Sequence, residues 1–554
     1  MVKQIWKKII YYRLLILAVL GVLFIFGMSY VFDFVKCKLP NIPVIIAGTK
    51  YLFYLIFGFA YAFIVFVILR SRRYLKLTGR RYFADIAKYY PRKYTDLVEV
   101  FQPATVQEMV VDDLPVKKWY ESSGIILGKV GKHLIHYEPK KDGVVIFVWG
   151  TPGTGKSTAI IIPTLITFGK QKNGTYKGSV MVLDLKGELY EKVKKYGTKR
   201  HIKLFSLMDP NKSVHFDPLI KIRKVSDEER EELLGNLSYI IIPDEASKDA
   251  AYFISVARAF FMGIFLYALH VKPETSFTKI CRDITQQDFK EWGAMIEDSG
   301  YETASKYTNQ FKNENETNVG GGYNKLSESV RLYTSGSLGS LLSNSGEVIT
   351  PADLDTGKTD IYIQVDATKL DYYSRVIGML FEVFMRETLE RRTRMENKTD
   401  GKAKYKPLAF VLDEFGQLPA IPAVPQMAAL GRGFNCSLLI ASQSLAMIDL
   451  HYGVEGRKAL IDCAKAHAFL SVKDPEVQKW ASDLVGTHKV LTLSSNQGNS
   501  ISQTNSSNRG FSYADKDEPF FKPNDFAKIV DEDKVIILYG SRHIKADKTY
   551  YYKK

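Results

Sequence analysis

The sequence predicts an α/β protein in which a doubly wound, mostly parallel sheet is combined with an all-α insertion domain and two N-terminal transmembrane helices. Three observations lead to this fold class. Short apolar runs alternate with helical patterns along much of the chain, as they do in parallel sheets covered by helices. The strand-like runs stop between about 221 and 350, where helical patterns take over. Two long uncharged apolar stretches lie near the start.

The two apolar stretches cover residues 14–32 and 51–69, about 19 residues each without a charge. At ~1.5 Å per residue each can cross a bilayer as a helix. Lys and Arg precede the first stretch and follow the second, which predicts cytoplasmic flanks, with both chain termini in the cytoplasm. A cleaved signal peptide is the alternative for 14–32, but its apolar region is too long and no small-residue cleavage site follows. We therefore expect a two-pass anchor at 1–70, with the rest of the chain in the cytoplasm.

The net charge of +16 is concentrated near this anchor. Residues 1–82 hold 13 Lys and Arg and a single acidic residue, Asp33, so the rest of the chain carries only about +4. The charge alone is therefore weak evidence for nucleic-acid binding. The four cysteines form no CxxC pair, which argues against a zinc site or a disulfide framework.

Behind a connector at 71–115, eight apolar or β-branched runs predict buried strands. They lie at 144–149, 179–185, 202–207, 359–365, 407–412, 435–441, 467–472 and 535–539. The stretch 371–392 has a helical pattern between two of them. We expect a nucleotide-binding domain at 116–220 plus 351–554 and an all-α domain at 221–350.

Two polar or glycine-rich segments within these domains are expected to be irregular. "NVGGGYN" (318–324) resembles a phosphate loop, but no strand precedes it, so a plain turn is expected. The Ser- and Asn-rich segment 494–513 is expected to be a polar loop.

A P-loop is predicted at residues 150–157, which fit the pattern G-x-x-x-x-G-K-[ST] between a strand and a helix. In this pattern glycines let backbone N–H groups surround a β-phosphate, the lysine reaches the β- and γ-phosphates, and the serine is a Mg²⁺ ligand. The expected cofactors are therefore ATP and Mg²⁺. The residues expected to bind them are Gly150, Thr151, Pro152, Gly153, Thr154, Gly155, Lys156, Ser157 and Thr158.

An acidic pair, Asp413 and Glu414, ends the apolar strand of "LAFVLDEFGQLP" (408–419). We expect Asp413 to hold Mg²⁺ together with Ser157, and Glu414 to take the proton from a water that attacks the γ-phosphate. Such a pair favours ATP hydrolysis on a RecA-like P-loop NTPase core over phosphoryl transfer to a hydroxyl; a pair of capping carboxylates is the alternative. Asp184, at the end of another strand, is a second candidate for the metal.

Two further residues are candidates for catalysis. Gln443 ends the strand that follows the acidic pair, where an amide can contact the γ-phosphate or the attacking water. Arg432 lies between two glycines before that strand, where it could reach the nucleotide of a neighbouring subunit as an arginine finger. A structural amide and an ordinary surface arginine are the alternatives.

In order and spacing, these motifs resemble those of the coupling proteins of type IV secretion and conjugation systems, the TraG/TraD-type ATPases. The resemblance covers nearly the whole chain. It rests on the two apolar spans and on "GIILGK" (124–129), "DLKGELY" (184–190), "DEFGQLPAIP" (413–422), "GRGFNCSLLIASQS" (431–444) and "YYKK" (551–554). Asp217 stands where the family usually has Asn.

The resemblance implies a membrane-anchored homo-hexameric ATPase that passes a relaxase–DNA complex to a type IV secretion channel and powers or gates conjugative transfer. Its implied partners are the relaxase, DNA in single-stranded form, inner-membrane components of the channel and the lipid bilayer. Lys194-Lys195 and Lys199-Arg200 are candidate DNA contacts, with a solvated surface as the alternative. The alternative functions are an FtsK-like DNA translocase and a receptor or scaffold in which ATP only supports assembly of the ring.

Overall fold

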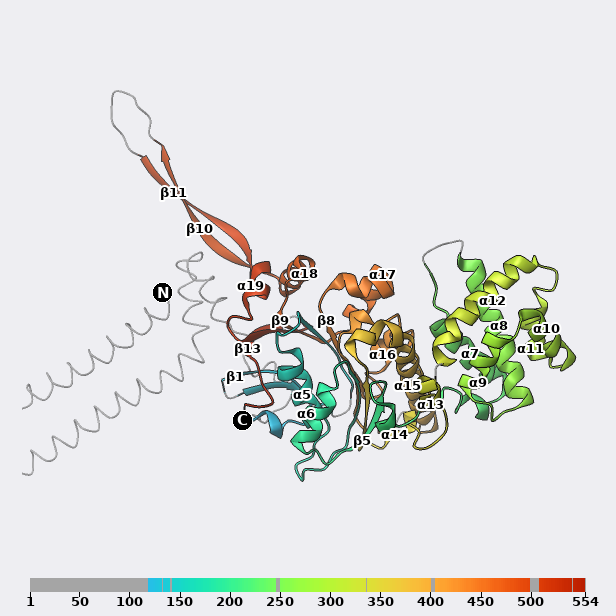
Figure 1. Cartoon of the computed structure of the whole chain (residues 1–554). Coiled ribbons are helices and arrows are strands. Elements are labelled where there is room, and N and C mark those ends of the chain that lie inside the picture. The colour runs from blue at the N-terminus through green and yellow to red at the C-terminus, as the bar shows by residue number, and fades with distance from the viewer. Residues whose placement is uncertain are drawn as a thin grey trace, which may run out of the picture. The chain divides into compact units, whose positions relative to one another are not determined.

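The computed structural model describes residues 118–553 apart from 132, 140–141, 246–249, 335, 400–403, 499–507 and 541 (Figure 1). The predicted transmembrane helices and the connector at 71–115 lie outside the described residues.

A mixed sheet of eleven strands forms the centre of the described part, in the order β2-β1-β13-β12-β9-β3-β8-β7-β4-β6-β5. From β9 to β5 all neighbours are parallel, and from β9 to β2 all are antiparallel. The strands are β1 Ile125–Val130, β2 His133–Tyr137, β3 Val145–Gly150, β4 Ser179–Asp184, β5 His201–Ser206, β6 Thr359–Gln364, β7 Leu408–Leu412, β8 Cys436–Ser442, β9 Ala466–Ser471, β12 Lys534–Tyr539 and β13 Arg542–Asp547.

The predicted mostly parallel sheet is confirmed, and each of the eight predicted runs forms one of its strands. The sequence did not predict β1, β2 and β13, which lie at the antiparallel end of the sheet. Polar residues interrupt the apolar ones in β2 and β13, so these strands lack the continuous apolar pattern.

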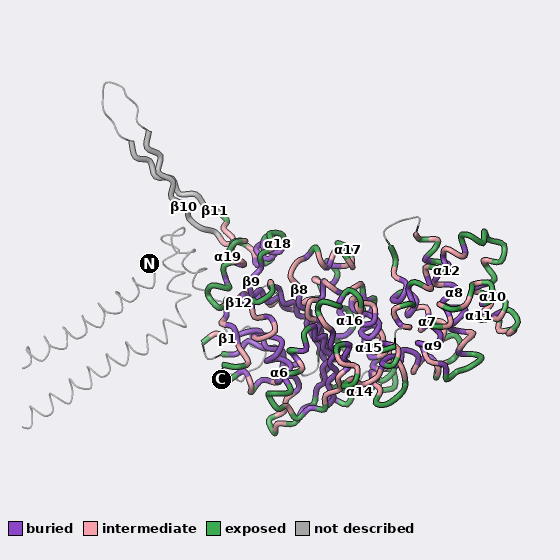
Figure 2. Tube along the Cα trace, in the orientation of Figure 1, coloured by how far each residue is buried: buried purple, intermediate pink, exposed green. Residues whose placement is uncertain are grey.

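Both faces of the sheet are buried (Figure 2). In β3, Phe147 and Trp149 contribute to one apolar cluster, and Ile146 and Val148 contribute to another on the opposite face. Helices α5 and α6 contribute to the second cluster, and α15, α16, α17 and α18 to the first. The continuous apolar runs in the sequence follow from this two-sided burial.

The helices are bounded as follows. After β3, a π-helical turn at Lys156–Ile161 leads into α5 Ile162–Thr167. The others are α6 Glu188–Tyr196, α7 Asp227–Ile241, α8 Ala250–Val271, α9 Phe277–Gln286, α10 Phe289–Asp298, α11 Glu302–Asn309, α12 Glu316–Arg331, α13 Gly336–Leu341, α14 Pro351–Asp355, α15 Leu370–Lys398, α16 Ala423–Leu430, α17 Leu445–Asp462, α18 Pro475–Val485 and α19 Pro523–Lys528.

Helices α7 to α14 lie between β5 and β6 in the chain, and α8 is central to their packing. Among the described residues α8 alone is long and apolar enough to cross a membrane, but 67% of its most apolar window is buried. It contacts α7, α11 and α12. This burial is that of a core helix.

The turn expected at 318–324 is wrong, because these residues lie inside α12. A Cβ atom on Gly322 would lie 2.4 Å from Cβ of Val256 in α8, and one on Gly321 would lie 2.8 Å from Cε1 of Phe253. Glycine here lets two helix backbones approach closely, which outweighs its low helix propensity.

The polar loop expected at 494–513 is also wrong where the structure describes it. Strands β10 Thr487–Gly498 and β11 Asn508–Pro519 pair antiparallel along their whole length. Ladder hydrogen bonds join backbone groups, so a strand pair can form from a segment whose composition resembles a loop.

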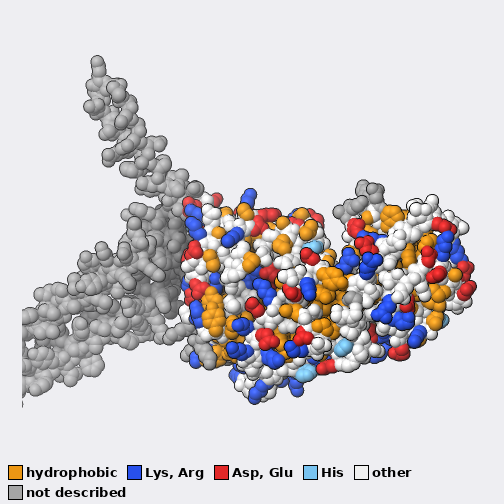
Figure 3. All heavy atoms as spheres, in the orientation of Figure 1, with side chains coloured by type: hydrophobic (Ala, Val, Ile, Leu, Met, Phe, Trp, Pro, Cys, Tyr) orange, Lys and Arg blue, Asp and Glu red, His pale blue; other side chains and the backbone are white. Residues whose placement is uncertain are grey.

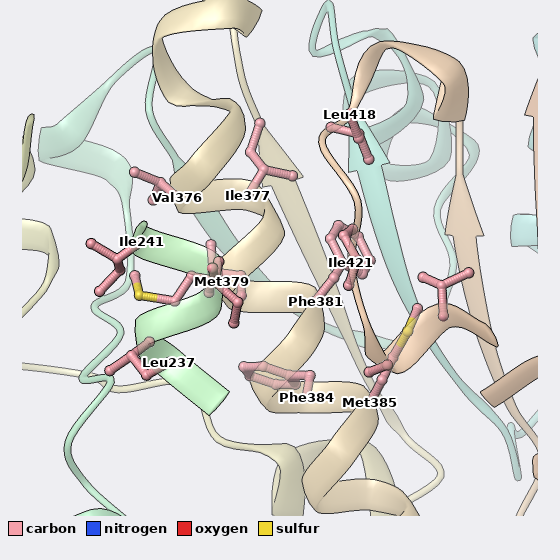
Figure 4. Close-up of a cluster of buried hydrophobic side chains, with 14 of the residues drawn as sticks. Leu237, Ile241, Val376, Ile377, Met379, Phe381, Phe384, Met385, Leu418 and Ile421 are labelled. Carbon is pink, nitrogen blue, oxygen red and sulfur yellow. The ribbon is translucent and has the colours of Figure 1, made fainter. Parts of the chain in front are cut away.

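Helix α15 connects the helical region with the segment that follows β7. Leu237 and Ile241 of α7 lie beside Met379 on one side of α15, and Leu418 and Ile421 lie on the other side (Figure 4). Apolar contact therefore runs without a break from α7 to the residues just beyond the acidic pair.

Candidate functional site

The predicted P-loop turns sharply between β3 and the helix that follows it. Gly153 and Gly155 have φ angles of 79° and 98°, in the left-handed region that glycine favours. A Cβ atom on Gly150 would lie only 2.7 Å from Oγ1 of Thr154. The helix begins directly at Lys156, so backbone N–H groups at its first turn are available to an anion.

The Lys156 ammonium joins the P-loop to the acidic pair. Its side chain is 5% exposed, and Nζ donates to the carbonyl of Gly150 at 2.7 Å and to Oε1 of Glu414 at 3.2 Å. The other oxygen of Glu414 accepts a hydrogen bond from Nε2 of Gln443. Three residues that are far apart in the sequence therefore converge at one point.

Strand order produces this convergence. Strand β8 lies between β3 and β7, so the C-terminal ends of all three parallel strands meet at one edge of the sheet. Glu414, two residues beyond β7, has a φ angle of 54°, which is uncommon for a residue other than glycine. Strain of this kind gathers at functional sites.

Asp413 lies beside the P-loop serine. Oγ of Ser157 donates to Oδ2 of Asp413 at 3.4 Å, and the backbone N–H of Glu414 donates to Oδ1 at 3.1 Å. Burial, followed by the charge of Glu414, raises the pKa of Asp413 to about 6, against the opposing effect of Lys156. A hydroxyl and a carboxylate side by side are hard oxygen ligands of the kind that Mg²⁺ takes together with nucleotide phosphates.

The remaining P-loop residues shape the loop itself. The N–H of Thr151 donates to the carbonyl of Ser471 at the end of β9, at 3.0 Å. Oγ1 of Thr154 donates to the carbonyl of Thr151 at 2.8 Å. Pro152 and Gly153 are exposed at the tip. Oγ1 of Thr158 lies 3.5 Å from the carbonyl of Gly155, at the start of the helix.

Asp184, the second candidate for the metal, anchors a helix. Both of its carboxylate oxygens accept backbone hydrogen bonds, from Leu189 at 3.2 Å and Tyr190 at 2.8 Å, in the first turn of α6. Burial raises the pKa of Asp184, although these hydrogen bonds act in the opposite direction. The oxygens of Asp184 are held by the first turn of α6, whereas Oδ2 of Asp413 lies beside the P-loop serine, so Asp413 is the better placed of the two carboxylates.

Asp217 also makes structural contacts. It forms a buried ion pair with Arg223 and accepts a hydrogen bond from the N–H of Leu219 at 3.0 Å. Arg223 in turn donates to the carbonyl of Thr275, which follows α8. Through Arg223, Asp217 therefore links the segment before α7 to the segment after α8.

Arg432 is not brought to this site. Its carbonyl accepts a hydrogen bond from Gly143, just before β3, whereas the P-loop follows β3. Arg432 and the P-loop are therefore separated by the length of β3, roughly 20 Å. The guanidinium is 70% exposed and lies 3.7 Å from Oδ2 of Asp142. Within one chain, Arg432 therefore lies at the opposite edge of the sheet.

One of the candidate DNA contacts is excluded by burial. Arg200 is fully buried in an ion pair with Asp360, so it cannot contact DNA at the surface. Lys194, Lys195 and Lys199 are exposed. On the face shown in Figure 3, basic and acidic side chains are interspersed over the described residues.

A contact that sequence reasoning missed comes from the segment after β13, Lys548–Lys553, which we call the strap. The N–H of Tyr551 donates to the carbonyl of Thr158 at 3.2 Å. A Cβ atom on Gly155 would lie 3.7 Å from Cε1 of Tyr550 and 3.8 Å from Cδ of Lys548. The only signal in the sequence was "YYKK", which supported the resemblance without indicating a site.

The chain is similar to known proteins in both sequence and structure. The sequence profile of the family described as "Type IV secretory system Conjugative DNA transfer" matches residues 107–554. Protein VirD4 of Agrobacterium fabrum is 23% identical over 407 residues, covering 72% of this chain and 57% of that protein. The chain thus spans somewhat more than half the length of this curated relative.

Two solved structures share the fold. The unbound bacterial conjugative coupling protein TrwBdeltaN70 has a TM-score of 0.57 at 15% identity, over 78% of this chain and 90% of that one. The plasmid coupling protein TrwB in complex with ADP and Mg²⁺ has a TM-score of 0.53 at 14% identity, over 76% and 89%. The predicted RecA-like α/β core is supported by this likeness.

Proposed function

The chain belongs to the type IV secretory system conjugative DNA transfer family, and on that premise we propose that it is a membrane-anchored coupling ATPase. In this role it brings a relaxase–DNA substrate to a type IV secretion channel and uses ATP hydrolysis to power or gate transfer. The observation that carries the proposal is the convergence of Lys156, Ser157, Asp413, Glu414 and Gln443 at one edge of the sheet.

The site fits a nucleoside triphosphate with Mg²⁺. Residues 150–158, all but Pro152 with a backbone N–H group, would surround the phosphates, and Lys156 would contact the β- and γ-phosphates. Ser157 and Asp413 would hold the Mg²⁺ ion, which when bound would neutralise charge on the phosphate oxygens. That a related coupling protein binds ADP and Mg²⁺ supports this assignment.

Glu414 and Gln443 act on the attacking water. The water oxygen forms a bond to the γ-phosphorus as the bond between that phosphorus and the ADP oxygen breaks. The Glu414 carboxylate accepts the proton of the water, and the products are ADP and phosphate. Gln443, already hydrogen-bonded to Glu414, holds the carboxylate in position and changes its contacts as the γ-phosphate leaves.

Arg432 acts in trans. Because it lies at the far edge of the sheet, it can reach a nucleotide only from a neighbouring subunit. An arginine finger in that position stabilises the charge that develops on the transferred phosphoryl group. The working form is then a ring or at least a dimer, and the resemblance to the TraG/TraD-type coupling proteins implies a homo-hexameric ring.

We place the ring on the cytoplasmic side of the bacterial inner membrane, held by the transmembrane segments that the sequence predicts at 14–32 and 51–69. Residues 116–220 and 351–554 form the nucleotide-binding domain, and 221–350 form the all-α domain. The unbroken apolar contact through α15 gives the helical region a physical connection to the acidic pair.

The test is phosphate release from Mg-ATP by the full-length chain in detergent, without DNA and with single-stranded or double-stranded DNA. We expect hydrolysis that single-stranded DNA stimulates and that Lys156→Ala abolishes, with Lys458→Ala, at an exposed position in α17, as the control. ATP binding without hydrolysis, with either DNA and at every protein concentration, would contradict the motor and favour a scaffold.

A further inference from the structure

We propose that Lys548 is a second phosphate-binding cation of the nucleotide site, placed there by the strap and directed at the α- and β-phosphates. The inference rests on the proposed function, because it needs a nucleotide in the P-loop. It adds to that function a residue more than 390 positions away from the P-loop lysine.

The strap is held at three points, one of them in the first turn of the P-loop helix. The N–H of Tyr551 donates to the carbonyl of Thr158 at 3.2 Å, and Nε1 of Trp119 donates to the carbonyl of Lys553 at 3.1 Å. The hydroxyl of Tyr550 donates to the carboxylate of Asp533. These contacts hold the backbone of the strap beside the first turn of the P-loop helix.

Lys548 is buried and only weakly paired. Its side chain is 3% exposed, and Nζ lies 3.9 Å from Oδ1 of Asp533. Asp533 also accepts from Tyr550 and lies 3.7 Å from Nζ of Lys553, so its charge is shared among three groups. Burial lowers the pKa of Lys548, which means that its ammonium lacks full compensation. A phosphate anion would supply that compensation.

The hydroxyl of the adjoining Thr549 is a second unused polar group. Its Oγ1 is buried and has no hydrogen-bond partner among the residues that the structure describes. Buried polar groups are nearly always hydrogen-bonded, so an orphaned hydroxyl in the residue that follows Lys548 in the chain supports the binding of a polar ligand by the strap.

The position of Lys548 indicates which phosphates it serves. Its Cδ lies 3.8 Å from the position that a Cβ on Gly155 would occupy, so the ammonium, two bonds further on, can reach the same part of the loop. Lys156 and the acidic pair occupy the side of the γ-phosphate, whereas Thr158 and the strap lie further along the helix. Lys548 is therefore placed to contact the α- and β-phosphates, which ADP and ATP share.

The test is titration of the full-length chain in detergent with ADP and with a non-hydrolysable ATP analogue. Lys548→Met keeps the buried stem and removes the charge, and Lys548→Arg keeps the charge. We expect Lys548→Met to weaken both ligands by about tenfold, as for the loss of one charge-assisted hydrogen bond. We expect kcat to change little and KM to rise, and the loss to shrink as salt is raised. Lys548→Arg should recover most of the affinity.

Lys545→Met is the matched control, because Lys545, on the neighbouring β13, pairs with Glu532 and its loss should leave affinity unchanged. The inference is overturned if Lys548→Met binds ADP within twofold of the parent while Lys156→Ala loses binding. It is overturned too if only the unfolding temperature without nucleotide falls, since that result shows a structural role. If the parent chain binds neither ligand, the proposed function fails as well.

Discussion

Nζ of Lys156 lies 3.2 Å from Oε1 of Glu414, so the P-loop lysine and the proposed general base form an ion pair. The phosphates of ATP compete for the same ammonium when they enter the loop. We expect that competition to free the Glu414 carboxylate for the attacking water. The ion pair thus keeps the base occupied until a nucleotide arrives.

Asp413 is expected to make the nucleotide-free protein less stable above pH 6. Its pKa is raised to about 6 from 3.8, so the folded state holds the proton more tightly than the unfolded state. The corresponding stability is fully present below about pH 4 and is lost as pH rises through about 6. Asp413→Asn should therefore raise stability at pH 7.5 by roughly 1–2 kcal/mol, and less at pH 5, while weakening Mg²⁺-dependent binding. Thermal unfolding of the parent and the variant at pH 7.5 and pH 5 measures the change in stability. An equal gain at both pH values would contradict the raised pKa of Asp413.

Gln443 is expected to affect turnover more than binding. Its amide holds Oε2 of Glu414, so Gln443→Ala should lower kcat on the order of tenfold to a hundredfold while KM changes little. Gln443→Glu retains the size but places a second negative charge beside Glu414, and should be at least as slow. Steady-state kinetics separate the two constants. A change confined to KM would show that Gln443 has no part in the chemical step.

We expect two inactive variants, one of which lacks Arg432, to restore each other's activity when they assemble together. Arg432→Ala should lower kcat on the order of 10³-fold, as for loss of an arginine finger, without changing the fold of its own exposed loop. Mixing Arg432→Ala chains with Lys156→Ala chains should restore part of the activity, because the second chain supplies the arginine to an intact P-loop. Hydrolysis by the co-assembled mixture is the measurement. A mixture as inactive as its components would place Arg432 outside the site.

The crossing of α8 and α12 is expected to depend on Gly322. Gly322→Ala places a Cβ atom 2.4 Å from Cβ of Val256 and should cost about 2 kcal/mol of stability through overpacking. Gly320→Ala is the matched control, since its Cβ atom would meet only Cε1 of Phe289 at 3.6 Å. That variant should be neutral or slightly stabilising, because Ala favours the helix. The unfolding temperatures of the two variants are the measurement. An equal change in both would contradict the close contact between α8 and α12.

The sheet and the P-loop were predictable because their signals are local. Strands buried on both faces appear as continuous apolar runs, and residues 150–157 carry a spacing that phosphate binding demands. The placement of Asp413, Glu414 and Gln443 at strand ends also follows from sequence, since the carboxyl ends of parallel strands share one edge.

Features that depend on distant partners were missed or misread. The sequence around Gly322 is typical of a turn, and only the packing of α8 against α12 explains the glycine. Arg200 reads as part of a surface cluster until Asp360, 160 positions away, buries it in an ion pair. The position of Asp184 at a strand end is typical of a metal ligand, but in the structure its carboxylate accepts two backbone hydrogen bonds from α6. Lys548 gives no signal at all until the strap returns to the P-loop.

The most direct test of the central claim is to measure Glu414→Gln in two assays, ATP hydrolysis by the full-length chain and conjugative transfer in mating cells. If Glu414 is the general base, hydrolysis should fall by a factor on the order of 10²–10⁴, transfer should be lost, and ATP binding should be retained or tightened by release of Lys156. Transfer that persists at the parental frequency without hydrolysis would contradict the claim that this site drives DNA transfer.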